Sequence, residues 1–232
     1  GTRALAAVGG STGQMVNLIV GFFVGLSSGA TVIIARYYGA KNKKDLNDTL
    51  HTAAALSVAG GILITIAGIL FTPSMLKIMK TPADVMADSA TYLRIYFGGI
   101  IFVFIYNVGS AILRAVGDST RPLYFLIVCC FINIFLDVLL VVGFNMGVAG
   151  AAIATVVSQA VSAVLVIWAL LKSTDMYCLH PKEIRFHKFL LVSIITIGLP
   201  AGIQSVMYNL ANMIIQTSLN DLGTSTMAAY TA

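Results

Sequence analysis

Six long apolar stretches, almost free of charged residues, constrain this chain more than any other feature of its sequence. They cover about residues 12–36, 50–71, 88–113, 122–143, 148–171 and 189–219. About 20 apolar residues in a helix cross a bilayer core of about 30 Å, so each stretch is long enough to span it. The composition agrees, because 58% of the 232 residues are hydrophobic and only 10% are charged. The sequence therefore predicts an all-α, polytopic membrane bundle with six transmembrane helices.

The segments between these stretches give no sign of enzymatic or nucleic-acid chemistry. The formal net charge of +5 sits in short connections, without a basic stripe interleaved with aromatic residues, so no nucleic-acid partner is expected. The sequence holds no HExxH or phosphate-loop motif, and its three cysteines form no CxxC pair. We therefore expect neither an enzyme nor a bound cofactor. Transport through such a bundle would draw on an ion gradient instead of ATP.

Lysine and arginine are distributed unequally between the two ends of the predicted bundle. If alternate connections share a side, one side holds ten of these residues and the other holds four. By the positive-inside rule the richer side is expected to be cytoplasmic. The richer side comprises Arg36, Lys41, Lys43, Lys44, Arg114, Arg121, Lys172, Lys182, Arg185 and Lys188, and the poorer side comprises Arg3, Lys77, Lys80 and Arg94.

The two ends of the chain resemble each other. GTRALAAVGG at residues 1–10 and GTSTMAAYTA at residues 223–232 share four residues in register, at an offset of 222. One period would contain six helices, an even number that returns the chain to the same side, so the copies would be parallel repeats of a twelve-helix transporter. The domains predicted are an amino-terminal lobe without its first helix (1–171), a cytoplasmic inter-lobe linker (172–188), and the first helix of the carboxyl-terminal lobe with the start of the next (189–232).

One acidic residue, Asp137, lies well inside a predicted span. An aspartate at a helix centre costs on the order of 2.5–3.5 kcal/mol on insertion scales, so it needs a compensating partner. Asn133 lies four residues earlier on the same helix face, and Thr155 on the next helix lies at a similar distance from the intervening turn. Their oxygens would suit a small hard cation, or a carboxyl that carries a proton. The alternative is that Asp137 is hydrogen-bonded to Asn133 and only holds the helices in register.

Other polar residues interrupt the spans and indicate a wet central cavity with aromatic and methionine walls, which include Tyr92 and Tyr96. Each of these residues alone is more typical of a hydrogen bond between helices. Their occurrence on several helices, however, fits a wet central cavity. The candidates for this substrate cavity are Gln14, Asn17, Asn107, Ser110 and Gln159.

Small residues and histidines are expected to have structural roles. Gly21, Gly25 and Gly29 are four residues apart, a spacing that lets helix backbones approach closely in lipid. His180 and His187 lie in the charged linker, whereas His51 lies at a helix end. We interpret these histidines as solvated surface residues and expect no histidine metal site.

Four motifs in this order and spacing resemble the MATE family, the multidrug and toxic compound extrusion transporters of the MOP flippase superfamily. They are GTRALAAVG at the start, LRAVGDSTRPLYF (113–125), GVAGAAIATVVSQ (147–159) and GLPAGIQS (198–205). The resemblance implies two six-helix lobes that exchange a sodium ion or a proton for small amphipathic, often cationic drugs by alternating access. It also implies a bacterial or archaeal cytoplasmic membrane, contact with membrane lipids and no obligate protein partner.

The same resemblance implies a cation site at Asn133, Asp137 and Thr155, with Asn107 in the adjoining substrate chamber. No metal is expected beyond a sodium ion at Asp137, and the partner acid on the family's first helix would lie before Gly1.

Two other functions are weighed against the drug antiporter. A lipid-linked oligosaccharide flippase of the same superfamily would need a cavity richer in arginine and lysine to hold pyrophosphate. The predicted spans offer Arg94 near one outer end and little else that is basic. A membrane enzyme acting on lipid head groups would need clustered acids or histidines near an interface, and the sequence has no such cluster. The sequence therefore favours the antiporter.

Overall fold

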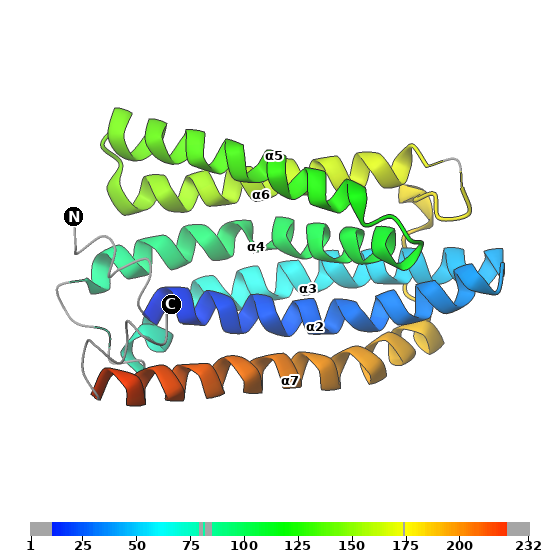
Figure 1. The fold of residues 1–232 in the computed structure, drawn as a ribbon, viewed down its shortest axis with the longest axis horizontal. Helices are drawn as coiled ribbons and strands as arrows, with labels where there is room; N and C mark the ends of the chain where they lie inside the picture. The colour runs from blue at the N-terminus through cyan, green and yellow to red at the C-terminus, as the bar shows by residue number, and fades with distance from the viewer. Residues whose placement is uncertain (1–10, 79–80, 82–84, 174, 222–232) are drawn as a thin grey trace.

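The computed structural model describes residues 11–78, 81, 85–173 and 175–221. Within these ranges the chain forms six long helices that lie side by side (Figure 1). Each contains a segment long and apolar enough to cross a membrane. The expected all-α membrane bundle is confirmed. The long helices are α2 (Ser11–Gly39), α3 (Lys43–Ile78), α4 (Met86–Ala115), α5 (Thr120–Asp137), α6 (Gly147–Leu171) and α7 (Lys188–Asp221).

The helices extend beyond the predicted spans because their polar ends remain helical outside the apolar core. The largest difference is at α3, which continues through Pro73 to Ile78, beyond the predicted span that ends at about residue 71. The Thr81 N–H donates to the Leu76 carbonyl at 3.1 Å and closes this end of the helix. The terminal repeat segments, 1–10 and 223–232, lie outside the described residues.

Helix α4 is the centre of the bundle, and α5 is its most peripheral member. Of the most apolar 18-residue window of each helix, 67% is buried in α4 but only 6% in α5. Helix α4 packs against α2, α3 and α6, whereas α5 packs mainly against α6. Helix α7 lies along α2, on the opposite side of the bundle from α5 (Figure 1). The large side chains of α4, including Phe97 and Phe104, are almost completely buried and form much of the core.

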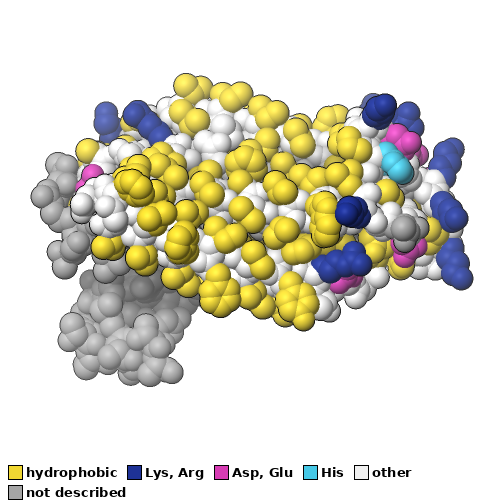
Figure 2. Space-filling model, turned by 90° about the horizontal axis from the view of Figure 1, so that it is seen from above, with side chains coloured by type: hydrophobic (Ala, Val, Ile, Leu, Met, Phe, Trp, Pro, Cys, Tyr) yellow, Lys and Arg dark blue, Asp and Glu magenta, His cyan; other side chains and the backbone are white. Residues whose placement is uncertain are grey.

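Alternate connections lie at the same end of the bundle, as the sequence indicated. The α2–α3 and α4–α5 connections and the linker before α7 share one end, and the α5–α6 turn lies at the other (Figure 1). Lysine and arginine gather at the linker end, and the face between the ends is dominated by hydrophobic side chains (Figure 2). We call the linker end the basic end.

Helices α2 and α7 meet along a glycine seam, defined as Gly21, Gly25 and Gly29 of α2 with Gly198 and Gly202 of α7. A Cβ atom added to Gly25 would lie 2.5 Å from the Gly202 backbone nitrogen and α-carbon, closer than real Cβ atoms approach. A Cβ on Gly21 would lie 2.8 Å from the Ser205 hydroxyl oxygen. The expected close packing is confirmed, and its partner is α7.

The linker is fastened to the basic end of α3 through His51. Contrary to the expected solvated position, this ring is buried, with 1% relative exposure. The His180 N–H donates to His51 Nε2 at 2.9 Å, and Nδ1 lies 2.7 Å from the Asn47 carbonyl, so both ring nitrogens are partnered. The next residue, Thr52, accepts a hydrogen bond from the His187 N–H at 3.2 Å. The charged linker packs back over His51 and removes it from water.

A second polar contact joins the linker to the first turns of α3. The Asn47 side-chain amide donates to the Glu183 carboxylate at 2.9 Å. This hydrogen bond lowers the pKa of the Glu183 carboxyl, because it favours the ionised form. The contact therefore contributes above the ordinary carboxyl pKa and is lost as pH falls through the lowered value.

We predict that Gly25→Ala separates α2 from α7 and lowers the thermal stability of the protein. The added methyl group has no room against the Gly202 backbone, and overpacking of this kind costs about 1–3 kcal/mol. The measurement is thermal unfolding in detergent. Gly98→Ala is the matched control, because a Cβ there meets nothing within 4 Å, and it should be neutral or slightly stabilising. Equal effects of the two substitutions would contradict the seam.

We predict that His51→Leu loosens the linker without unfolding the bundle. The substitution leaves the His180 N–H without its acceptor, and a buried unpaired donor costs about 1–3 kcal/mol. Backbone hydrogen exchange should therefore speed up in residues 176–187. Thr49→Val is the control, because the buried Thr49 hydroxyl bonds only to Asp45 of its own helix. Unchanged linker exchange in His51→Leu would show that other contacts hold the segment.

Candidate cation site

Asp137 is the last α-helical residue of α5 and directly precedes a π-helical turn, η1 (Val138–Gly143). Such wide turns recur at functional sites, because they redirect side chains and free backbone groups. The Asp137 side chain is partly buried, and its Oδ1 atom is fully enclosed with no hydrogen-bond partner. Among the described residues, no ion pair reaches this carboxylate. Its charge is therefore uncompensated by a fixed group in the part of the protein that the structure shows.

Asn133, one turn before Asp137, is also left without a partner. Its Nδ2 atom is buried and makes no hydrogen bond. The alternative that Asp137 only holds the helices in register needs a hydrogen bond between Asn133 and Asp137, and the Asn133 amide makes no such bond. Two adjacent buried polar groups with unused capacity are uncommon in native proteins, and each calls for a ligand, water or ion.

Thr155 of α6 and Tyr92 of α4 complete the group around Asp137. The Tyr92 phenol interacts with the Thr155 side chain and lies close enough to the Asp137 carboxylate to feel its charge. The Thr155 hydroxyl donates to the Ala151 carbonyl at 2.9 Å, which leaves its oxygen lone pairs free to accept or coordinate. Three different helices, α4, α5 and α6, thus bring oxygen atoms to one place.

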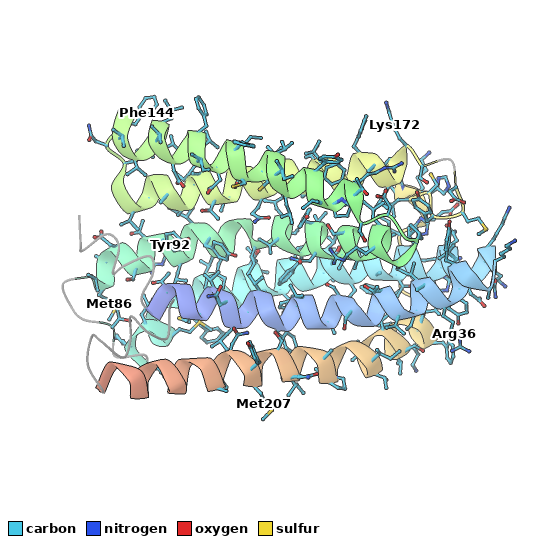
Figure 3. The ribbon with its side chains drawn as sticks, viewed as in Figure 1. Arg36, Met86, Tyr92, Phe144, Lys172 and Met207 are labelled. Atoms are coloured by element: carbon cyan, nitrogen blue, oxygen red, sulfur yellow. The ribbon has the colours of Figure 1, made fainter. Side chains whose placement is uncertain are left out.

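These residues lie at one depth in the bundle. Tyr92 lies six residues from the start of α4, and Asp137 lies six residues from the end of η1. Thr155 lies eight residues from the start of α6. At 1.5 Å per residue this is roughly 9–12 Å from the same end. Figure 3 shows Tyr92 on α4 toward the end that carries Phe144, opposite the basic end with Arg36 and Lys172.

The sequence predicted Tyr92 as an apolar cavity wall and did not predict that it lies beside Asp137 and Thr155. Its ring stacks on Tyr96 at a centroid distance of 6.2 Å, and both rings are buried. The signal that could have placed it is its distance from the start of α4, which matches the depth of Asp137. That distance was uncertain without the helix boundary at Met86.

The chemistry of this group favours a small hard cation or a proton. Carboxylate, amide and hydroxyl oxygens are ligands that such cations prefer, and a carboxyl group in an apolar bundle can also bind a proton. A cluster of three or more histidine, cysteine or acidic side chains, as a transition metal needs, does not occur among the described residues. The group of Asn133, Asp137, Thr155 and Tyr92 is called the Asp137 site below.

The five residues expected in the substrate cavity are spread along the height of the bundle. Asn107 and Ser110 lie 15 and 18 residues beyond Tyr92, roughly 22–27 Å along α4 and in its basic-end half. The Asn107 amide donates to the Val103 carbonyl of its own helix at 2.8 Å, whereas Ser110 is fully buried. The structure does not bring these two residues to the Asp137 site.

The remaining cavity candidates lie on α2 and α6. Asn17 is exposed on α2, and the side chain of Gln14 lies outside the described residues. Gln159 follows Thr155 by four residues, so it lies one turn from the Asp137 site on α6, and its Oε1 accepts a bond from Ser162 at 3.4 Å. Of the five, Gln159 is the nearest to the site along its helix.

A hydrolase-like pattern in α2 carries no hydrolytic chemistry. GLSSG at residues 25–29 matches GxSxG, which in serine hydrolases places the nucleophile on a sharp turn between a strand and a helix. Here all five residues are helical, and the Ser27 hydroxyl donates to the Phe23 carbonyl at 2.8 Å. Gly25 and Gly29 belong to the glycine seam, which accounts for the spacing.

Six helices long and apolar enough to cross a membrane define a polytopic membrane protein. The MatE family model matches residues 1–139. The chain therefore belongs to the MatE family, as its motifs indicated. It is a multi-pass membrane protein and not an enzyme.

Known relatives match this chain over nearly its whole length. The chain is 33% identical to the probable multidrug resistance protein YoeA of Bacillus subtilis, over 99% of its own length and 51% of that protein. The inward-facing structure of a multidrug resistance MATE transporter has a TM-score of 0.84 at 27% identity, covering 91% of this chain and 48% of that one. The outward-facing structure has a TM-score of 0.85 at 26% identity, covering 94% and 48%. The chain spans about half the length of the relatives it matches.

We predict that Asp137→Asn stabilises the protein in alkaline, sodium-free buffer, by about 1 kcal/mol or more, because it removes an uncompensated partly buried charge. Thermal unfolding in detergent measures this. Added sodium should then stabilise the unsubstituted protein by mass action but leave the variant unchanged if sodium is the ligand. Asp88→Asn, at an exposed acid on the first turn of α4, should have no effect in either buffer. A destabilised Asp137→Asn would instead reveal a permanent partner for the carboxylate.

Proposed function

We propose that the whole protein carrying this chain exports drug-like molecules in exchange for a sodium ion or a proton that binds at Asp137. The observation that carries this proposal is the enclosed Asp137 Oδ1 without a hydrogen-bond partner. An ionisable residue inside a membrane span is expensive and marks ion pathways and proton relays. A charge of this kind is kept where a mobile cation neutralises it during a transport cycle.

Cation binding would change the packing of three helices together. A sodium ion at Asp137 would draw in the Asn133 amide oxygen and the Thr155 hydroxyl, whereas a proton would let the carboxyl donate to one of them. Tyr92 interacts with Thr155 and senses the carboxylate charge, so it would transmit the change to the central helix α4. The π-helical turn after Asp137 gives the end of α5 freedom to bend in response.

Export would follow if the packing change on cation binding is coupled to a switch of two lobes between inward-facing and outward-facing states. Relatives of this chain are described as multidrug resistance proteins, and inward- and outward-facing structures of such a transporter share its fold. The glycine seam between α2 and α7 supports this assignment, because small residues let two helices slide or part at low cost in side-chain rearrangement. The fastened linker would carry motion between the lobes. Small amphipathic or cationic molecules would bind near Gln159 and the Tyr92–Tyr96 pair.

The rival function, a lipid-linked oligosaccharide flippase, gains no support from the described spans. A pyrophosphate group needs several charge-assisted hydrogen bonds, usually from arginine. Arg94 is the one basic residue well inside a described span, and its side chain is exposed.

The experiment is drug-dye efflux from drug-sensitive cells that produce the whole protein with Asp137 intact or replaced by Asn. Asp137→Asn should reduce coupled efflux to the level of cells without the transporter, because the exchanged cation loses its charged ligand. Asp88→Asn is the matched control and should export normally. Repeating the assay with a sodium gradient alone and a proton gradient alone identifies the coupling ion. Full coupled efflux by Asp137→Asn, at normal protein levels, would refute the proposal.

A further inference from the structure

A hollow of about 580 Å³ lies at the basic end, where α5 begins and α6 ends, far from the Asp137 site. Figure 3 marks its position through Lys172, which lies at the opposite end of the bundle from Phe144. We call it the interfacial hollow. It is lined by Arg121, Phe125, Trp168, Ala169, Lys172, Ser173, Asp175 and Tyr177.

Two cations are held at the rim of the interfacial hollow. The Lys172 Nζ lies 4.7 Å from the centroid of the Trp168 ring, a cation–π contact that fixes the ammonium beside the opening. Arg121 lies in the first turn of α5, where the positive end of the helix dipole adds to its charge. Arg121 Nε donates to Asp118 at 3.0 Å, yet its side chain is 51% exposed, so the rest of the guanidinium is accessible.

The one carboxylate in the lining is already engaged. Asp175 Oδ2 accepts a hydrogen bond from the Tyr38 hydroxyl at 3.1 Å, and Oδ1 accepts one from the Met176 N–H at 2.7 Å. The lining therefore carries two cations and one carboxylate, and a second carboxylate, Asp118, pairs with Arg121 from outside the lining. Lys172 has no ion-pair partner among the described residues, and the exposed part of the Arg121 guanidinium keeps N–H groups free, so both can bind the single negative charge of a phosphodiester.

The surface around the interfacial hollow is built for lipid. Trp168, the one tryptophan of the chain, is 54% exposed at the level where the apolar surface gives way to charged residues, the position typical of an interfacial anchor. Exposed apolar side chains, including Phe131 and Phe135 on α5 and Val164 on α6, continue from it along the bundle. Figure 2 shows this change from hydrophobic surface to gathered lysine and arginine at the basic end.

We propose that the interfacial hollow binds the phosphate of an anionic phospholipid of the phosphatidylglycerol type, taken from the membrane leaflet at the basic end. Lys172 and Arg121 contact the phosphate, Trp168 lies at the glycerol level, and the acyl chains lie along the exposed faces of α5 and α6. Basic pockets at the cytoplasmic ends of membrane helices recognise lipid headgroups in this way. The site is independent of the Asp137 site and of any transport activity.

The test is native mass spectrometry of the whole protein in detergent, with equal amounts of phosphatidylglycerol and phosphatidylcholine that carry the same acyl chains. Phosphatidylglycerol should be retained in preference to phosphatidylcholine. The double variant Arg121→Gln, Lys172→Gln should weaken phosphatidylglycerol retention by about fivefold for each cation removed. The swapped variant Arg121→Lys, Lys172→Arg keeps both charges and should retain the lipid.

The control removes the same charge elsewhere at the basic end. Arg36→Gln with Lys41→Gln should keep phosphatidylglycerol retention, because both residues are exposed and neither lines the hollow. An equal loss in this control would reduce the effect to general surface charge and overturn the proposal. Equal retention of phosphatidylcholine, or full displacement of the lipid by inorganic phosphate, would also overturn it.

Discussion

The account of this structure depends on one interaction, the missing neutralisation of the Asp137 carboxylate within a membrane-spanning bundle. Water cannot solvate the enclosed Oδ1, and no basic side chain among the described residues neutralises it. A fixed partner would have made the group a structural ion pair. The described residues contain no such partner, and this leaves room for the proposed ion exchange, in which a cation binds the carboxylate and leaves again. Tyr92 gains its significance from this carboxylate, because it interacts both with the Asp137 charge and with the Thr155 side chain of a neighbouring helix.

The other helices and the linker are held together by different kinds of contact. Helix α4 is rigid because its large apolar side chains are buried among α2, α3 and α6. At the glycine seam the backbones of α2 and α7 lie in direct contact, and α2 packs more extensively against α7 than against any other helix. The linker, by contrast, is fastened to α3 by directional hydrogen bonds through His51 and Thr52. The linker therefore joins α7 to α3 by directional contacts at the basic end, while the Asp137 site lies toward the other end of the bundle.

The sequence predicted the architecture well because membrane insertion leaves few alternatives. The spans, the alternation of their ends and the close packing at Gly25 follow from apolar length, basic loops and glycine spacing. The depth match of Asp137 and Thr155 followed from counting residues to the turn between α5 and α6. Local patterns could not show which helix faces meet, so the partner of the seam, the place of Tyr92 and the burial of His51 were missed. Asn107 and Ser110 were assigned to the substrate cavity because their polarity is visible in a sequence, whereas their depth relative to the other cavity candidates is not.

The most direct measurement of the central claim is infrared difference spectroscopy of the whole protein as sodium is added or pH is lowered. A cation that binds Asp137 changes the carboxylate stretching bands, and a proton replaces them with the band of a protonated carboxyl in an apolar environment. The account predicts one such change at functional ion concentrations, and its loss in Asp137→Asn. A spectrum that is the same in the protein and the variant would contradict the account, because the carboxylate would then take no part in ion exchange.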